Sequence, residues 1–207
     1  MKAACFRLSM VASLLAGLSG CGTSEPIRYY SLAAPAQSSL SGSARMLVEV
    51  LPVAVPERLN RTEMILTGAD GRLDIRYADQ WAAPVADEIA QVVDDVLWRT
   101  LGATDTYRAP TPAVAGGPPQ YRLALHVERF EAGPSLSATV SASWTIRRLP
   151  QGTSATCRVQ VTSSLATLSP DKVATALSQA SGQVAELVAD SLGRLNRDLP
   201  DVCPAGM

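Results

Sequence analysis

The chain has 207 residues, 47% of them hydrophobic, and its 18 basic and 19 acidic residues nearly cancel to a net charge of −1. This size suits one folded domain with an extension. The positive charge is scattered, and Arg147-Arg148 is the longest basic cluster. Because nucleic-acid-binding proteins usually carry a basic stripe, the composition argues against a nucleic-acid partner.

The first 20 residues have the pattern of a bacterial export signal. Lys2 and Arg7 precede an uncharged apolar stretch at residues 8–18, and small residues follow it. This stretch is too short to cross the hydrocarbon core of a bilayer, which takes about 20 apolar residues. The tetrapeptide Leu18-Ser19-Gly20-Cys21 resembles the lipobox of bacterial lipoproteins. We therefore expect covalent diacylglycerol and an acyl chain on Cys21, and no other cofactor; the alternative is an ordinary signal peptide with a chance cysteine.

These features divide the chain into a signal peptide (residues 1–20), a lipidated tether (residues 21–28) and one domain (residues 29–207).

Cys157 and Cys203 remain in the domain as an even pair. In an oxidising compartment such a pair predicts a disulfide, and two free thiols are the alternative. Two cysteines and one histidine without close ligand spacing do not predict a metal site.

The first part of the domain predicts short strands. Residues 29–32 form a candidate first strand, and the Ala/Ser/Pro-rich residues 33–44 predict a loop. Residues 46–55 are apolar and β-branched, but Pro52 restricts this strand to an edge or interrupts it. Residues 64–66 and the alternating residues 73–77 flank Asp70-Gly71, which predicts a hairpin.

A helix is predicted from Pro84 to Gly102, because apolar residues recur there at helical spacing. Its acidic residues Asp87-Glu88 and Asp94-Asp95 are assigned to the solvated polar face, rather than to acid/base catalysis.

Alternating residues then predict strands at 121–130, 136–148 and 156–168, and a long amphipathic helix is predicted at 170–199. The fold class expected from this order is α+β: a single domain with a mostly antiparallel β-sheet and two main helices packed on it.

Three segments in order resemble one family. The run from Val48 to Arg61 (VEVLPVAVPERLNR), followed by residues 64–66, resembles the opening of the PqiC-like lipoproteins, which are also described as auxiliary lipoproteins of ABC-type transport. Residues 29–32 (YYSL) and 77–85 (YADQWAAPV) resemble two further signatures. The Cys157/Cys203 pair is not part of this pattern.

The resemblance implies a non-enzymatic outer-membrane lipoprotein that faces the periplasm. Such a protein works beside an MCE-domain protein and its ABC transporter, which carry lipid between the inner and outer membranes and support membrane integrity. The alternative is a free-standing lipoprotein that assists outer-membrane assembly or binds a small apolar ligand. The sequence leaves open whether the protein is a homo-oligomer, which lipid moves and in which direction.

No residue is predicted to be catalytic. His126, the only histidine, lies in the middle of an alternating strand with Arg122 and Glu128 nearby, so we interpret it as a paired surface residue. No Gly-x-Ser-x-Gly motif offers a serine nucleophile.

The resemblance carries over four family-pattern positions as candidate partner contacts: Leu59, Arg61, Trp81 and Pro84. Leu59 and Arg61 are expected to be exposed in the loop after Pro56, where they could serve a partner surface. For Trp81 we favour packing over the end of the first helix rather than a partner contact.

Overall fold

Three long antiparallel strands form one side of the sheet: β6 (Gln120–Gly133), β7 (Ser137–Arg148) and β8 (Ser154–Ser164), with β8 at the edge. The computed structural model describes residues 25–32, 42–112, 116–150 and 152–204. Along β6, burial alternates, so that Leu125 and Val127 are buried and His126 between them is exposed. This period of two is expected for a strand with one covered face, and the three predicted strands are confirmed.

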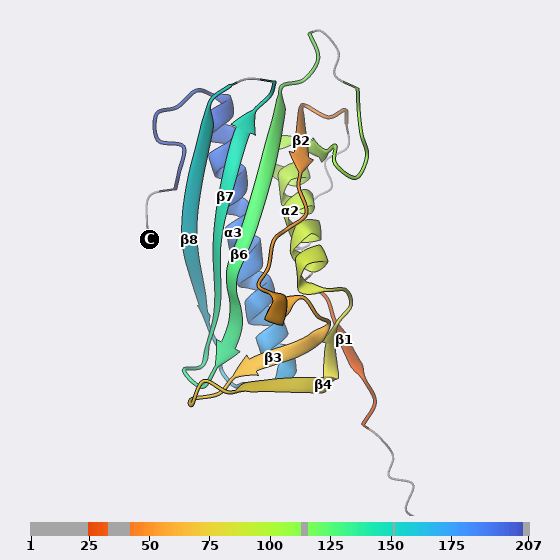
Figure 1. Cartoon of the computed structure of the whole chain (residues 1–207), viewed down its shortest axis with the longest axis vertical. Helices are drawn as coiled ribbons and strands as arrows, with labels where there is room; N and C mark the ends of the chain where they lie inside the picture. Colours follow the sequence, from red (N-terminus) through yellow and green to blue (C-terminus); the bar gives the residue numbers. More distant parts are fainter. Residues whose placement is uncertain (1–24, 33–41, 113–115, 151, 205–207) are drawn as a thin grey trace, which may run out of the picture.

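The other edge of β6 pairs with two strands, one near each end. Near its start β6 is parallel to β2 (Met46–Val50), which in turn is parallel to the short strand β5 (Ala103–Asp105). Near its end β6 pairs with β3 (Glu63–Thr67) of the predicted hairpin. The second hairpin strand, β4 (Leu73–Trp81), is antiparallel to β3 and parallel to β1 (Arg28–Tyr30). Because the antiparallel strands pair over many more residues, the eight-stranded sheet is mostly antiparallel, as expected, although β6 also has the parallel neighbours β2 and β3 (Figure 1).

Two helices, α2 (Val85–Leu101) and α3 (Pro170–Asn196), contact each other and the sheet (Figure 1). Pro84 precedes α2, and Gly102 ends it with a φ of 64°, a left-handed conformation that glycine adopts readily. The apolar face of the amphipathic helix α3 is buried against β6, β7 and β8. Leu187, which also belongs to the apolar face predicted from the sequence, is only partly buried. The expected α+β class, with two main helices on a mostly antiparallel sheet, is confirmed.

Several boundaries differ from the sequence prediction. β1 ends at Tyr30, so Ser31 and Leu32 lie beyond it. β2 ends before Pro52, which has no amide hydrogen to donate, and pairing with β6 resumes only as a bridge between Ala54 and His126. β5 and the 3₁₀ helix η2 (Glu57–Leu59) were not predicted, because three residues are too few for a periodic pattern.

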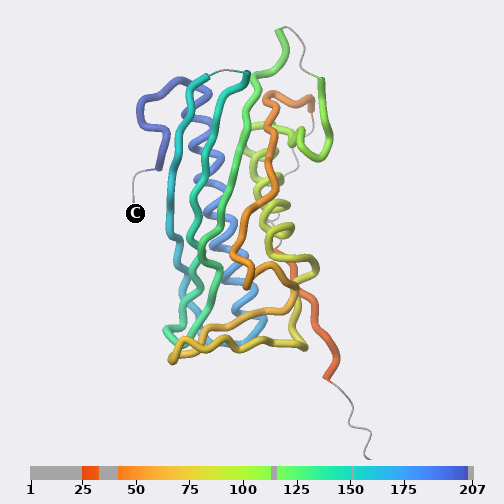
Figure 2. The backbone as a smooth tube through the Cα atoms, in the orientation of Figure 1, coloured from red at the N-terminus to blue at the C-terminus, as the bar shows by residue number. Residues whose placement is uncertain are grey.

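A disulfide joins Cys157 of β8 to Cys203 in the C-terminal tail, with an S–S distance of 2.07 Å, as the cysteine pairing predicted. The tail therefore lies beside β8, whereas the N-terminal segment leaves the domain next to β4 (Figure 2).

Candidate functional site

The segment that enters the domain from the N-terminal side is bound by two buried carboxylates. Cys21 itself lies outside the described residues. β1 runs parallel to the last residues of β4, with Arg28 opposite Asp79. The Asp79 side chain is only 2% exposed and accepts a hydrogen bond from Arg28 Nε at 2.9 Å. A buried carboxylate needs such partners, because burial without them costs far more than an ordinary hydrogen bond gains.

The second buried carboxylate is Glu88, in the first turn of α2. It is 7% exposed and accepts hydrogen bonds from the Leu32 amide at 2.7 Å and from Ser31 Oγ at 2.9 Å. The assignment of Glu88 to the solvated face of the helix is therefore wrong. The residues just after β1 cover this part of α2, and their polar groups take the place of water.

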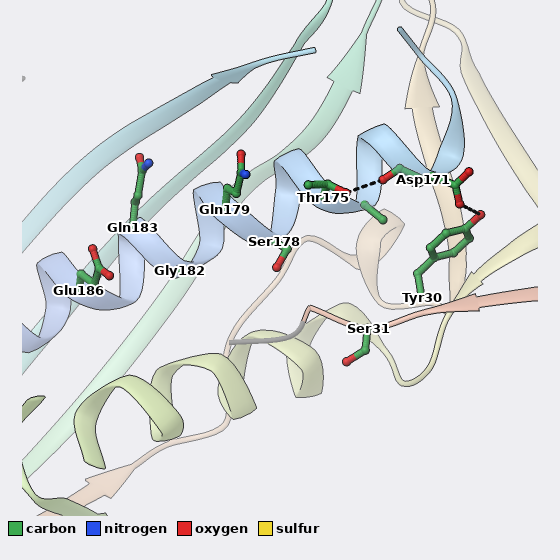
Figure 3. A pocket seen from close by; sticks show the side chains of 10 residues that line it. Tyr30, Ser31, Asp171, Thr175, Ser178, Gln179, Gly182, Gln183 and Glu186 are labelled. Carbon is green, nitrogen blue, oxygen red and sulfur yellow. Dashed lines mark hydrogen bonds between the residues drawn. The ribbon is translucent and has the colours of Figure 1, made fainter. Parts of the chain in front are cut away.

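Tyr30 links β1 to α3. Its hydroxyl lies 3.2 Å from Asp79 Oδ1 and 3.1 Å from Asp171 Oδ1, at the start of α3 (Figure 3). Burial, the hydrogen bond to Asp171 and the nearby Asp79 charge together raise the pKa of Tyr30 to about 12. The hydroxyl is protonated at neutral pH, as in any tyrosine, and donates its single hydrogen to one of the two carboxylates at a time. We call the contacts of Asp79, Glu88 and Asp171 with residues 28–32 the β1 clamp.

An open groove of about 660 Å³ runs from the β1 clamp along α3 (Figure 3). Tyr30 and Ser31 line one end, and most of the groove is lined by successive turns of the helix. The helix contributes mostly hydroxyl, amide and carboxyl groups: Asp171, Ala174, Thr175, Ser178, Gln179, Gly182, Gln183 and Glu186. Most of the side chains that line the groove therefore carry a polar group, while their aliphatic parts, together with Ala174 and Gly182, add apolar surface.

The structure brings three of the four family-pattern positions together. Leu59, Arg61 and Trp81 line one small crevice, next to Val85 at the start of α2. Trp81 is buried, and its ring meets the Phe130 ring edge-on with a centroid distance of 5.6 Å. Trp81 therefore packs inside the core, and the ring contact that it makes is with Phe130 of β6.

Leu59 is also buried, so the expectation that it would be exposed in its loop is wrong. The 3₁₀ helix η2 turns this side chain into the core. Arg61 remains partly exposed and pairs with Glu63 at 3.1 Å. Pro84 stands at the N-cap of α2. Partner contact at these four positions stays a prediction.

His126 is exposed on the face of β6 that points away from the helices, as predicted. Its expected pairing is not found, since Arg122 pairs with Glu49 and Glu128 pairs with Arg158. Within the described ranges, no three His, Cys, Asp or Glu side chains are grouped to hold a metal ion. No helix in the described part of the chain is both long and apolar enough to span a bilayer.

The β1 clamp would have been hard to find from the sequence. Asp79 lies in an alternating strand, and Glu88 in a helical first turn where acidic residues are common. The resemblance did mark both segments, at residues 29–32 and 77–85, but as motifs rather than as contacting groups.

The fold and the β1 clamp define a class: an α+β domain whose first strand, directly after a short N-terminal segment, is bound into the body of the protein. The family model described as "ABC-type transport auxiliary lipoprotein component" matches residues 30–189. The chain belongs to this family, and the resemblance seen in the sequence is confirmed.

Two crystal structures share the fold. One, of an uncharacterized protein, has a TM-score of 0.66 at 20% identity and covers 81% of this chain and 99% of its own. The other is a Xanthomonas campestris protein described as a member of DUF330. It has a TM-score of 0.61 at 18% identity and covers 83% of this chain and 98% of its own. No curated protein is similar enough to count as a match.

Proposed function

We propose that this chain is a non-enzymatic, lipid-anchored docking component of an ABC-type lipid transport system. In this proposal acyl chains on Cys21 hold it at the outer membrane, where it receives one end of an assembly built by an MCE-domain protein and its transporter. Membership of the auxiliary lipoprotein family supports the transport role. Gly22 follows the cysteine, rather than the Asp that commonly retains lipoproteins at the inner membrane in enteric bacteria.

The observation that carries the docking role is the β1 clamp. From Cys21 to Arg28 the chain can extend at most about 25 Å, at roughly 3.3–3.6 Å per residue. Arg28, Tyr30, Ser31 and Leu32 are held by Asp79, Asp171 and Glu88. A domain anchored in this way stays near the membrane surface. It does not carry lipid across the periplasm by itself. The short anchor therefore favours a role as a membrane-bound docking site over a role as a diffusing lipid carrier.

The groove beside the β1 clamp is open, and several of its side chains carry hydroxyl, amide or carboxyl groups that can form hydrogen bonds with a protein partner. We therefore favour docking of a protein here over the alternative of a small apolar ligand.

Complementation of a deletion strain under detergent stress tests the proposal. Cys21→Ser should fail to rescue growth, since it removes the thiol that carries the lipid. His126→Ala should rescue fully, because the imidazole is exposed and without a partner among the described residues. If an unanchored chain rescues and His126→Ala does not, the docking proposal is wrong and an enzymatic role must be considered. A mass spectrum of the mature N-terminal peptide decides the anchor directly.

A further inference from the structure

One end of the domain carries most of its exposed large apolar side chains. Of the seven among the described residues, five lie on the segment entering β1, on β4 and in the turn between β6 and β7. We call this set the apolar end; it consists of Ile27, Tyr29, Leu73, Tyr77 and Leu136. Pairing of β1 with β4, of β4 with β3 and of β3 with β6 places these segments along one end of the domain, with the turn between β6 and β7 near the start of β4 and β1 beside the end of β4 (Figure 1).

An irregularity in β4 turns Tyr77 outward. Glu63 pairs with Gln80, but the next residue, Met64, pairs with Arg76, so extra residues of β4 bulge between these pairs. In a regular strand Tyr77 would share a face with Asp79 and Trp81. Both of those side chains are buried, whereas Tyr77 is 69% exposed. Bulges often re-aim a side chain in this way.

The charges at this end are largely paired, so they do not select a strongly charged partner. Arg28 pairs with Asp79, Arg72 with Asp70, and Arg76 with Asp74. Exposed tyrosines beside leucine and isoleucine, with arginines close by, suit the boundary between lipid headgroups and acyl chains. There the ring can lie in the apolar zone while the hydroxyl remains hydrated.

We propose that the apolar end rests on the surface of the membrane in which the chain is anchored, as a second contact besides the lipid. The inference rests on the proposed anchoring at Cys21. Ile27 is only six residues from that cysteine, so it lies within about 22 Å of the anchor point at full extension. The contact orients the domain, so that α3 and its groove take a defined direction relative to the membrane. So small a surface binds a membrane only weakly by itself. The anchor strengthens the contact, because it keeps the apolar end at a high local concentration next to the membrane.

The native tyrosines provide the test. The mature chain, residues 21–207 with its disulfide intact, is coupled through the Cys21 thiol to a maleimide phospholipid in zwitterionic vesicles. Tyrosines are then iodinated by a reagent confined to water, and each site is quantified by peptide mass spectrometry. Tyr29 and Tyr77 should lose iodination several-fold relative to the uncoupled chain. Tyr107, which is 47% exposed and lies beside the middle of α2, should be unchanged and serves as the internal control.

A variant distinguishes direct contact of the apolar end with the membrane from mere tethering of the domain nearby. Leu73→Ser combined with Tyr77→Ser removes two of the five side chains of the apolar end without touching the β1 clamp, and should restore much of the iodination of Tyr29. The matched variant Tyr107→Ser should leave Tyr29 protected. Added salt should have little effect, since the surrounding charges are already paired.

Two results would overturn the inference. One is iodination of Tyr29 and Tyr77, measured relative to Tyr107, that is the same on vesicles as in the uncoupled chain. The other is a fall in this relative iodination when the uncoupled chain is concentrated to the same level without vesicles, which would mean that a second copy covers this end. Because the coupling is chemical, neither result bears on whether the cell lipidates Cys21. An unmodified Cys21 in protein from cells would instead contradict the proposed function alone.

Discussion

The Glu88 carboxylate accepts a hydrogen bond from the backbone amide of Leu32, 56 residues earlier in the chain, at a distance of 2.7 Å. Both groups are buried, and the first turn of α2 also favours a negative charge through the helix dipole. This contact, together with that of Asp79, fixes where the N-terminal segment enters the domain. In the proposed anchoring, these carboxylates would set the position of the domain relative to its anchor.

Substitution of Glu88 should destabilise the domain. Glu88→Ala leaves the Leu32 amide without its acceptor, and we expect the free energy of unfolding to fall by about 2–3 kcal/mol, as for other buried charge-assisted hydrogen bonds. Asp87→Ala is the matched control, because Asp87 lies in the same helical turn but is largely exposed. Its salt bridge with Arg108 is long, at 3.6 Å, and is open to solvent. It should cost less than about 1 kcal/mol. Urea denaturation measures both, and equal losses would contradict a special role for Glu88.

Loss of the Asp79 carboxylate should loosen β1. Asp79→Asn weakens the contacts with Arg28 and Tyr30, so β1 should detach from β4 more often. Each detachment exposes the peptide bond between Arg28 and Tyr29 to protease. Limited trypsin digestion after Arg28 is therefore expected to become several-fold faster. Asp74→Asn, which removes only an exposed pair with Arg76, should leave that rate unchanged. Unaltered cleavage in Asp79→Asn would show that β1 is held by other contacts.

The stability of an Asp94 variant should depend on pH. Burial raises the pKa of the Asp94 carboxyl, and the nearby Asp105 and Asp95 charges raise it further, with Arg108 acting in the opposite direction. The folded protein therefore binds this proton more tightly than the unfolded chain, and the ionised carboxylate costs stability above the raised pKa. Asp94→Asn removes this cost, so it should be more stable than the parent at neutral pH.

This advantage should shrink as the pH falls through the raised pKa toward the ordinary value for aspartate, about 3.9, where Asp94 is neutral in both states. Thermal unfolding of the parent and the variant at several pH values measures the difference. An advantage that grows in acid would refute the assignment.

The disulfide should raise the free energy of unfolding, by an amount that depends on the length of the loop that it closes. Cys157 and Cys203 are 46 residues apart in sequence, and the chain-entropy model gives at most about 4 kcal/mol for a loop of that size. Reductant, or the double variant Cys157→Ala/Cys203→Ala, should lower the urea midpoint accordingly. Non-reducing peptide maps of periplasmic protein should contain the cross-linked pair; two freely alkylated thiols there would contradict the prediction.

The sequence by itself determined the order and type of the main elements, because their signals are local. Pro84 and Gly102 bound α2, Asp70-Gly71 lies in the turn of the hairpin, and the period of two marks β6 and β7. These signals depend on neighbours a few residues away, so a single sequence contains them. The family was equally accessible, since its motifs are continuous segments.

Only the tertiary structure decided which way several side chains point. Glu88 and Asp87 are adjacent acids in one helical turn, yet one is buried and the other exposed, because Ser31 and Leu32 return to cover only one side of the helix. Leu59 was expected in an exposed loop, but it ends the 3₁₀ helix η2 and is buried in the core. Tyr77 and Asp79 would share a face in a regular strand, but a bulge separates them. In each case the environment is supplied by residues far away in sequence or by a shift in pairing, and neither leaves a local pattern.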